Sequence, residues 1–117
     1  MIGLPSTVRI FLIQEPTDMR KGFYTLADIV SNLGQNPLSG HLFVFLSKKC
    51  DRCKILCWND GGYILWYKKL EKGKFKKPKI SNDQKEVAIS ASQLTMILEG
   101  IDFSKIKKSK RWNPKST

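Results

Sequence analysis

The sequence contains a single histidine, few acidic residues, and no apolar run close to the roughly 18 residues that a transmembrane helix needs. The histidine, His41, heads an apolar segment, so we expect it to have a structural role rather than to serve a catalytic triad. Glycine-rich phosphate-binding loops of the Walker or dinucleotide type are also missing. These absences argue against several common classes of enzyme and against an integral membrane protein.

Cysteine is scarce, and all three cysteines lie close together, at Cys50, Cys53 and Cys57. An odd, clustered set is not the framework of a secreted disulfide-bonded domain, and the N-terminus lacks a signal-peptide pattern, so we expect a cytoplasmic protein. The C-x-x-C spacing raises zinc as an alternative. If residues 53–58 form a strand, however, Cys53 and Cys57 stand about 13 Å apart, too far for one tetrahedral shell. We therefore predict buried or turn cysteines, no metal and no cofactor.

The carboxylates do not form a recognisable nuclease site. We expect Thr17 or Asp18 to cap a helix, and Asp60 to form a turn. The remaining candidates for binding a catalytic divalent cation, Asp51 and Glu71, lie among basic residues that they partly neutralise. We therefore predict that the protein is not an enzyme.

Apolar periodicity predicts an α+β fold that begins with a strand and a helix. A β-branched and aromatic run at 8–13 predicts the strand, and apolar residues at three- and four-residue spacing predict a helix over about 19–33. Near the other end, residues 86–89 predict a short strand. Ser90 and Gln93 then form the capping box of a second helix.

Between these elements the sequence predicts a three-stranded antiparallel meander. Apolar runs at 41–46, 54–58 and 63–67 read as strands, and Asp60-Gly61 is a strong signal for a tight hairpin turn between the last two. The whole is expected to be a small antiparallel sheet in one domain, residues 1–103. Residues 104–117 are expected to form a basic, flexible tail.

Positive charge dominates the composition, with 21 basic residues against 10 acidic ones and a formal net charge of +11. Most of it lies in three blocks, at residues 48–54, 68–79 and 104–117. In the predicted meander the first two blocks meet. The connection between the strands at 41–46 and 54–58 carries the first block, and the second block begins where the strand at 63–67 ends, which is the same end of the sheet. Like charges held together cost stability, which favours a polyanionic partner, and nucleic acid is the most abundant one.

Two further features favour nucleic acid over a solvated surface or a protein partner. Arg20 and Lys21 would lie at the first turn of the predicted helix, where cations oppose the helix dipole but suit a phosphate held by free backbone N–H groups. Aromatic residues interleave with lysines at Trp66, Tyr67 and Phe75, where ring faces could stack on bases or sugars. Trp66 and Tyr67 should point to opposite faces of the sheet, so at least one is expected in the core. The predicted DNA-binding residues are Arg20, Lys21, Lys48, Lys49, Arg52, Lys54, Lys68, Lys69, Lys72, Lys74, Lys76 and Lys77.

Four segments carry a family resemblance: TDMRKGFYTLADIV (17–30), PLSGHLFVF (37–45), KILCWNDGGYILWYKKLEKGKFKKP (54–78) and AISASQLTMILEGID (88–102). In this order they resemble the TnpB accessory protein, the second open reading frame product of the bacterial insertion-sequence-66 transposon family. The resemblance implies a small protein that assists transposition alongside a separate, larger DDE-type transposase. It does not imply catalysis.

The chain departs from the family pattern in its basic residues. Lys48, Lys49 and Lys69 stand where arginine is usual. Lysine keeps the positive charge but lacks the guanidinium group that forms bidentate hydrogen bonds. Replacing arginine by lysine therefore affects phosphate binding less than sequence-specific recognition of bases.

We therefore predict a non-catalytic accessory protein of DNA transposition whose lysine-rich surface binds transposon ends or target DNA. The alternative is a protein–protein adaptor that binds the transposase, or another protein of the element, without touching DNA.

Overall fold

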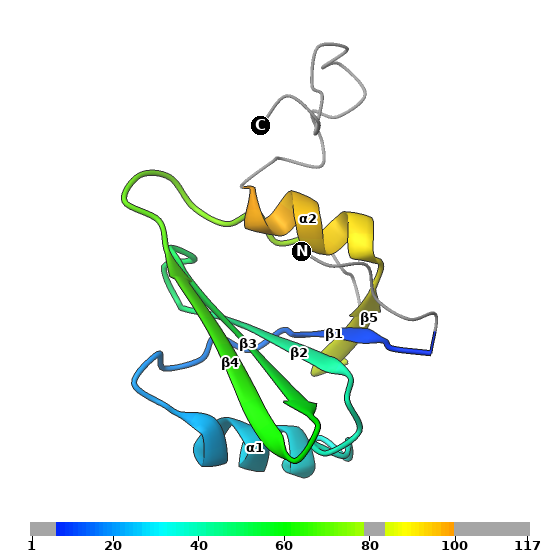
Figure 1. Ribbon diagram of the computed structural model, residues 1–117. Coiled ribbons are helices and arrows are strands. Elements are labelled where there is room, and N and C mark those ends of the chain that lie inside the picture. Colours follow the sequence, from blue (N-terminus) through cyan, green and yellow to red (C-terminus); the bar gives the residue numbers. More distant parts are fainter. Residues whose placement is uncertain (1–6, 79–83, 100–117) are drawn as a thin grey trace.

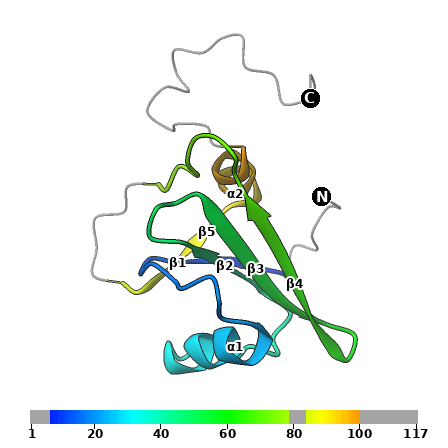
Figure 2. The ribbon, with the colours of Figure 1, turned by 90° about the vertical axis from the view of Figure 1, so that its left-hand side faces the viewer.

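A computed structural model describes residues 7–78 and 84–99 and shows a sheet with a helix on each face (Figures 1 and 2). The predicted α+β class is confirmed, and the predicted strands and helices are present with shifted ends. The proposed domain boundary at residue 103 and the tail 104–117 lie outside the described residues. The elements in chain order are β1 (Ile10–Ile13), α1 (Phe23–Asn32), β2 (Leu42–Leu46), β3 (Arg52–Asn59), β4 (Gly62–Lys69), β5 (Glu86–Ile89) and α2 (Ala91–Leu98).

The strand order is β4-β3-β2-β1-β5. As predicted, β2, β3 and β4 form an antiparallel meander, and Asp60 and Gly61 both adopt positive φ in the two-residue turn between β3 and β4. The prediction of a wholly antiparallel sheet is wrong at one pair. The chain crosses over through α1 between β1 and β2, so these two strands run parallel and the sheet is mixed.

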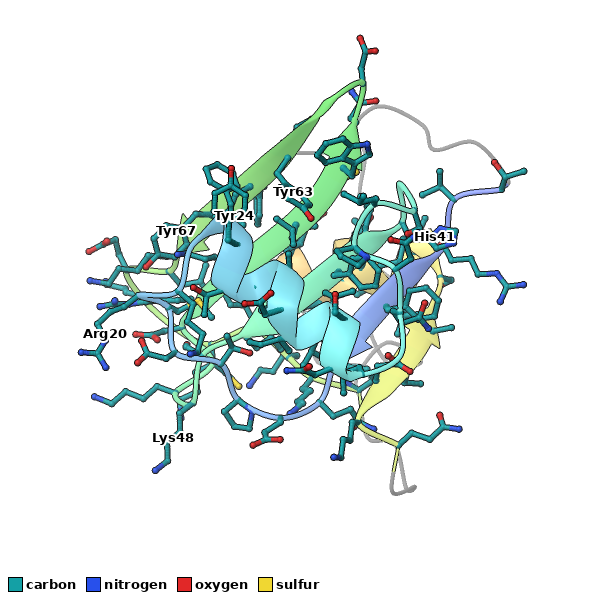
Figure 3. The ribbon with its side chains drawn as sticks, turned by 90° about the horizontal axis from the view of Figure 1, so that it is seen from below. Arg20, Tyr24, His41, Lys48, Tyr63 and Tyr67 are labelled. Carbon is teal, nitrogen blue, oxygen red and sulfur yellow. The ribbon has the colours of Figure 1, made fainter. Side chains whose placement is uncertain are left out.

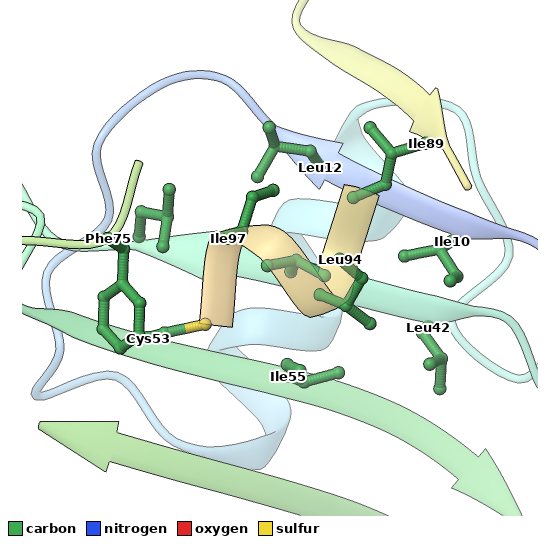
Figure 4. Close-up of a cluster of buried hydrophobic side chains, with 11 residues drawn as sticks. Ile10, Leu12, Leu42, Cys53, Ile55, Phe75, Ile89, Leu94 and Ile97 are labelled. Carbon is green, nitrogen blue, oxygen red and sulfur yellow. The ribbon is translucent and has the colours of Figure 1, made fainter. Parts of the chain in front are cut away.

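The core has two halves because successive residues of a strand face opposite sides of the sheet. One set of strand side chains packs with Leu94 and Ile97 of α2 (Figure 4), and the alternate set packs with Leu26 and Val30 of α1. All five residues of the central strand β2 are buried. Within the described ranges, neither helix has the length and apolar character to cross a membrane.

The two helices begin differently. The predicted capping box of α2 is confirmed: Gln93 N–H donates to Ser90 Oγ at 3.0 Å, and Ser90 N–H donates to Gln93 Oε1 at 2.8 Å. The predicted start of α1 is wrong, since this helix begins at Phe23 without a side-chain cap. Its expected caps act elsewhere. The Thr17 hydroxyl donates to the Glu15 carbonyl at 3.5 Å, its N–H donates to the Leu46 carbonyl of the sheet, and Asp18 accepts the Arg20 N–H in a local turn.

Phe75 anchors the chain that follows β4. Its side chain is only 2% exposed and belongs to the α2-facing cluster together with Cys53 and Ile97 (Figure 4). The expectation that this ring stacks on nucleic acid is therefore wrong. The backbone is tied down as well, because Leu70 N–H donates to the Asp51 carbonyl at 2.7 Å and Phe75 N–H donates to the Cys50 carbonyl at 2.6 Å.

The cysteines occupy buried or turn positions, as predicted. Cys53 is fully buried, and burial raises the pKa of its thiol to about 12. Burial also raises the pKa of the half-buried Cys57, and Cys50 lies in the turn before β3 with φ at 58°. Among the described residues, the structure holds no group of three or more histidine, cysteine and acidic side chains placed to bind a metal.

We expect Phe75→Ala to lower the free energy of unfolding by about 3–5 kcal/mol, because it leaves a cavity the size of an aromatic ring in the core. Urea unfolding followed by tryptophan fluorescence measures this change. Lys74→Ala and Lys76→Ala are matched controls, since these exposed neighbours should shift the unfolding free energy by less than about 0.5 kcal/mol. Equal effects of all three substitutions would contradict the anchoring role of the ring.

Candidate nucleic-acid interface

Exposed lysines gather at the end of the sheet where β2 leads into β3 and where β4 ends. This juxtaposition follows from the meander, because alternate connections of antiparallel strands lie at the same end. The sequence predicted that the two basic blocks meet there, and the structure confirms it. We call these lysines, together with the partly exposed Arg52, the basic surface; it comprises Lys48, Lys49, Arg52, Lys68, Lys69, Lys72, Lys74 and Lys76.

The β2–β3 connection presents the first pair of these cations. Lys48 and Lys49 occupy the centre of a turn closed by Cys50 N–H donating to the Ser47 carbonyl at 2.9 Å. The Ser47 hydroxyl donates to Asp51 Oδ1 at 3.2 Å, which fixes the base of the turn. Both lysines are exposed at its tip. The turn thus holds two positive charges away from the sheet at a defined place.

Segment 70–78 places a second group of lysines beside this turn. Its hydrogen bonds to the Cys50 and Asp51 carbonyls hold the two connections together, and Gly73, with φ at 79°, allows the segment to bend. Lys72, Lys74 and Lys76 are all exposed. Because the segment joins the turn through its backbone and the Phe75 ring, its charged side chains remain outside.

The ammonium groups of two lysines predicted to bind DNA are held by backbone carbonyls instead, and one of these lysines is buried. Lys54 is only 7% exposed, and its Nζ donates to the Lys21 carbonyl at 2.7 Å and lies 4.8 Å from the centre of the Tyr67 ring. It is buried because strand alternation directs it to the side of the sheet that α1 covers. Lys77 is exposed, but its ammonium donates to the Gln14 carbonyl. We leave both lysines out of the basic surface.

Arg20 and Lys21 lie at the same end of the sheet, but not in the predicted way. They precede α1, and their backbone N–H groups both bond to Asp18, so the expected phosphate site on free helical N–H groups is not formed. The Arg20 guanidinium lies 2.6 Å from the Asp18 carboxylate. This contact holds the pKa of the carboxyl below its usual range and raises the pKa of Arg20. The charge of Arg20 is therefore largely compensated by Asp18, although in Figure 3 its side chain points to the same side of the molecule as Lys48.

The aromatic residues of β4 are exposed on both faces. Trp66 is 41% exposed and Tyr67 is 48% exposed, so the prediction that one of them lies in the core is wrong. The reason is that β4 forms an edge of the sheet, whereas the α2-facing cluster draws its strand residues from β1, β2, β3 and β5. Ile64, on the same side of β4 as Trp66, is exposed as well.

Sequence reasoning missed two tyrosines, Tyr24 and Tyr63, that contact each other on the α1 side of the sheet. Tyr24 of α1 is 78% exposed, and its ring lies 6.2 Å from that of Tyr63 in an edge-to-face arrangement. The available signal was that Tyr24 falls outside the apolar stripe of the helix. Although Tyr24 is highly exposed, its ring contacts Tyr63 of β4, so it lies where α1 meets the sheet.

Comparison with known proteins places the chain in a family. The family described as IS66 Orf2 like protein matches residues 8–108. Two similar proteins come from Sinorhizobium fredii (strain NBRC 101917 / NGR234), and both carry the name of an uncharacterized protein. The protein y4jC is 34% identical over 109 residues, covering 92% of each chain, and y4hO is 42% identical over 104 residues, covering 86% of this chain and 88% of its own. No solved structure matches. The chain therefore belongs to the IS66 Orf2-like family.

Proposed function

We propose that the protein is a non-catalytic accessory factor of transposition that binds DNA through the basic surface. Family membership implies the accessory role in transposition. One observation supports DNA as the partner: backbone hydrogen bonds hold two lysine-rich segments side by side, namely the turn at Lys48 and Lys49 and segment 70–78. Transposon ends and target DNA are the two candidate ligands.

The chemistry of the surface favours contact with the DNA backbone. Like charges held together repel one another, and a polyanion relieves that repulsion. The exposed cations are nearly all lysines, whose ammonium groups act as point charges and lack the planar fork that reads guanine. Phosphate contacts of this kind position a protein on DNA without selecting its sequence. The proposal is therefore a factor that holds DNA for a separate transposase.

We expect affinity for DNA to fall steeply with salt. If about six phosphates are neutralised, the logarithm of the association constant should decline against the logarithm of salt concentration with a slope of roughly -5. Fluorescence anisotropy with labelled terminal repeats, and with random DNA of equal length, measures this slope. A slope near zero, or no binding at low salt, would overturn the proposal.

We expect the double substitution Lys48→Gln with Lys49→Gln to reduce the magnitude of that slope by about 2, because two phosphate contacts are lost. The exposed Arg9, which precedes β1 at the opposite end of the sheet, supplies a control. Arg9→Gln also removes positive charge but should leave the slope close to that of the unaltered protein. A comparable reduction by Arg9→Gln would mean that net charge, and not the basic surface, determines binding.

An adaptor that binds the transposase is the second candidate, supported by the exposed apolar residues Ile64 and Trp66 on the free edge of β4. Edge strands offer unpaired backbone groups to another chain, and apolar side chains add contact area. A pull-down of the purified transposase separates the two candidates. DNA binding predicts that nuclease treatment abolishes capture, whereas an adaptor predicts capture that survives nuclease and is lost in Trp66→Ser.

A further inference from the structure

The Tyr67 ring is held in a fixed orientation by a buried positive charge. The Lys54 ammonium lies 4.8 Å from the ring centre, and its hydrogen bond to the Lys21 carbonyl keeps it there. Lys54 is 7% exposed, whereas Tyr67 is 48% exposed. One side of the ring thus covers an ammonium group while a large part of the ring stays open to solvent. Turning the ring away would uncover the ammonium, so its orientation is preset.

One pair of cations that can bind phosphates lies next to this ring. Tyr67 lies opposite Lys54 in the β3–β4 pairing, and the next pair on the same side of the sheet is Arg52 with Lys69. Both Arg52 and Lys69 belong to the basic surface. The open ring therefore lies at the margin of the basic surface, within reach of the same bound strand.

The aromatic surface continues from Tyr67 along β4. Tyr63 lies four residues earlier on the same side of the strand and makes edge-to-face contacts with Tyr24 and Trp58, at 6.2 and 5.0 Å between ring centres. Figure 3 shows Tyr67, Tyr24 and Tyr63 following one another beside the N-terminal end of α1. Three tyrosines thus extend the basic surface along one side of the β4 edge.

The spacing of these rings decides what form of nucleic acid they can receive. Tyr63 and Tyr67 stand about 13 Å apart along the strand, at about 3.3 Å per residue. Bases in a duplex follow one another every 3.4 Å or so, and their faces are covered by their neighbours. Only bases that have left the duplex stack can lie on tyrosines spaced in this way. Aromatic rings beside a positively charged groove are the usual means of binding single strands without sequence preference.

We propose that Tyr67, with Tyr63 and Tyr24, forms a stacking site for unpaired bases, so that the DNA held at the basic surface is single-stranded there. This inference rests on the proposed function. Phosphates contact Lys69 and the neighbouring lysines, while a base lies on the open side of the Tyr67 ring. Because every base has a ring face, the site does not select sequence.

Binding of a single-stranded oligonucleotide and of a duplex of the same length, at one salt concentration, tests the inference. We expect tighter binding of the single strand. Tyr67→Leu should weaken single-strand binding roughly tenfold or more and leave duplex binding unchanged, because it removes the ring and keeps the charges. Tyr67→Phe is the matched control and should retain single-strand binding. Circular dichroism confirms that each variant is folded.

An oligonucleotide with abasic sites supplies a second probe, because it keeps the phosphates and lacks the bases. We expect the unaltered protein to bind it at least as weakly as Tyr67→Leu binds the intact single strand. The loss of the bases should cost Tyr67→Leu less affinity than it costs the unaltered protein, because only the stacking on Tyr63 and Tyr24 remains to be lost. Equal binding of single strand and duplex, or a loss in Tyr67→Leu that is the same for both, would overturn the inference while DNA binding itself stands. Failure to bind either form would instead overturn the proposed function.

Discussion

The burial of one aromatic ring, Phe75, determines where the lysines of segment 70–78 lie. Segment 70–78 has no regular secondary structure, and its lysines repel those of the neighbouring turn. Ordering such a segment costs conformational entropy at every residue. Burying a phenylalanine stabilises the folded state by about 1.5–3 kcal/mol. The backbone hydrogen bonds to Cys50 and Asp51 fix the position of the segment beside the β2–β3 turn. The lysines of segment 70–78 are therefore part of the basic surface because an apolar side chain in their midst is buried.

Much of the fold was predictable from local pattern. The alternation in the three central runs and the Asp60-Gly61 turn specify the meander, and Ser90 with Gln93 specifies the start of α2, because each signal acts over a few residues. The start of α1 was not predictable in this way. Thr17 reads locally as a cap, but its N–H donates to the Leu46 carbonyl, which ties this residue to the end of β2, and the helix begins only at Phe23. The Leu46 partner is known only once the strands are assembled.

The features of the candidate site also fall into those that local sequence predicts and those that depend on the assembled sheet. The meeting of the two basic blocks follows from the order of the strands, so the sequence predicted it. The burial of Lys54 and Phe75 and the exposure of Trp66 and Tyr67 depend on which parts of the sheet the helices cover and on β4 being an edge. Residue type misleads here, since a lysine is inside and two aromatic residues are outside. Periodicity gives the side of a strand but not what lies over it.

The packing of Phe75 against α2 also determines how late in chain synthesis the basic surface can be completed. Its pocket belongs to a cluster that includes Leu94 and Ile97 of α2, and β5, the edge strand next to β1, also comes from this last part of the fold. A nascent chain emerges from its N-terminus, so the lysines leave the ribosome before the helix that fixes their backbone. Until α2 has formed, the Phe75 ring lacks the two side chains of that helix that help to bury it. The finished arrangement of the lysines in segment 70–78 is thus a property of the completed fold.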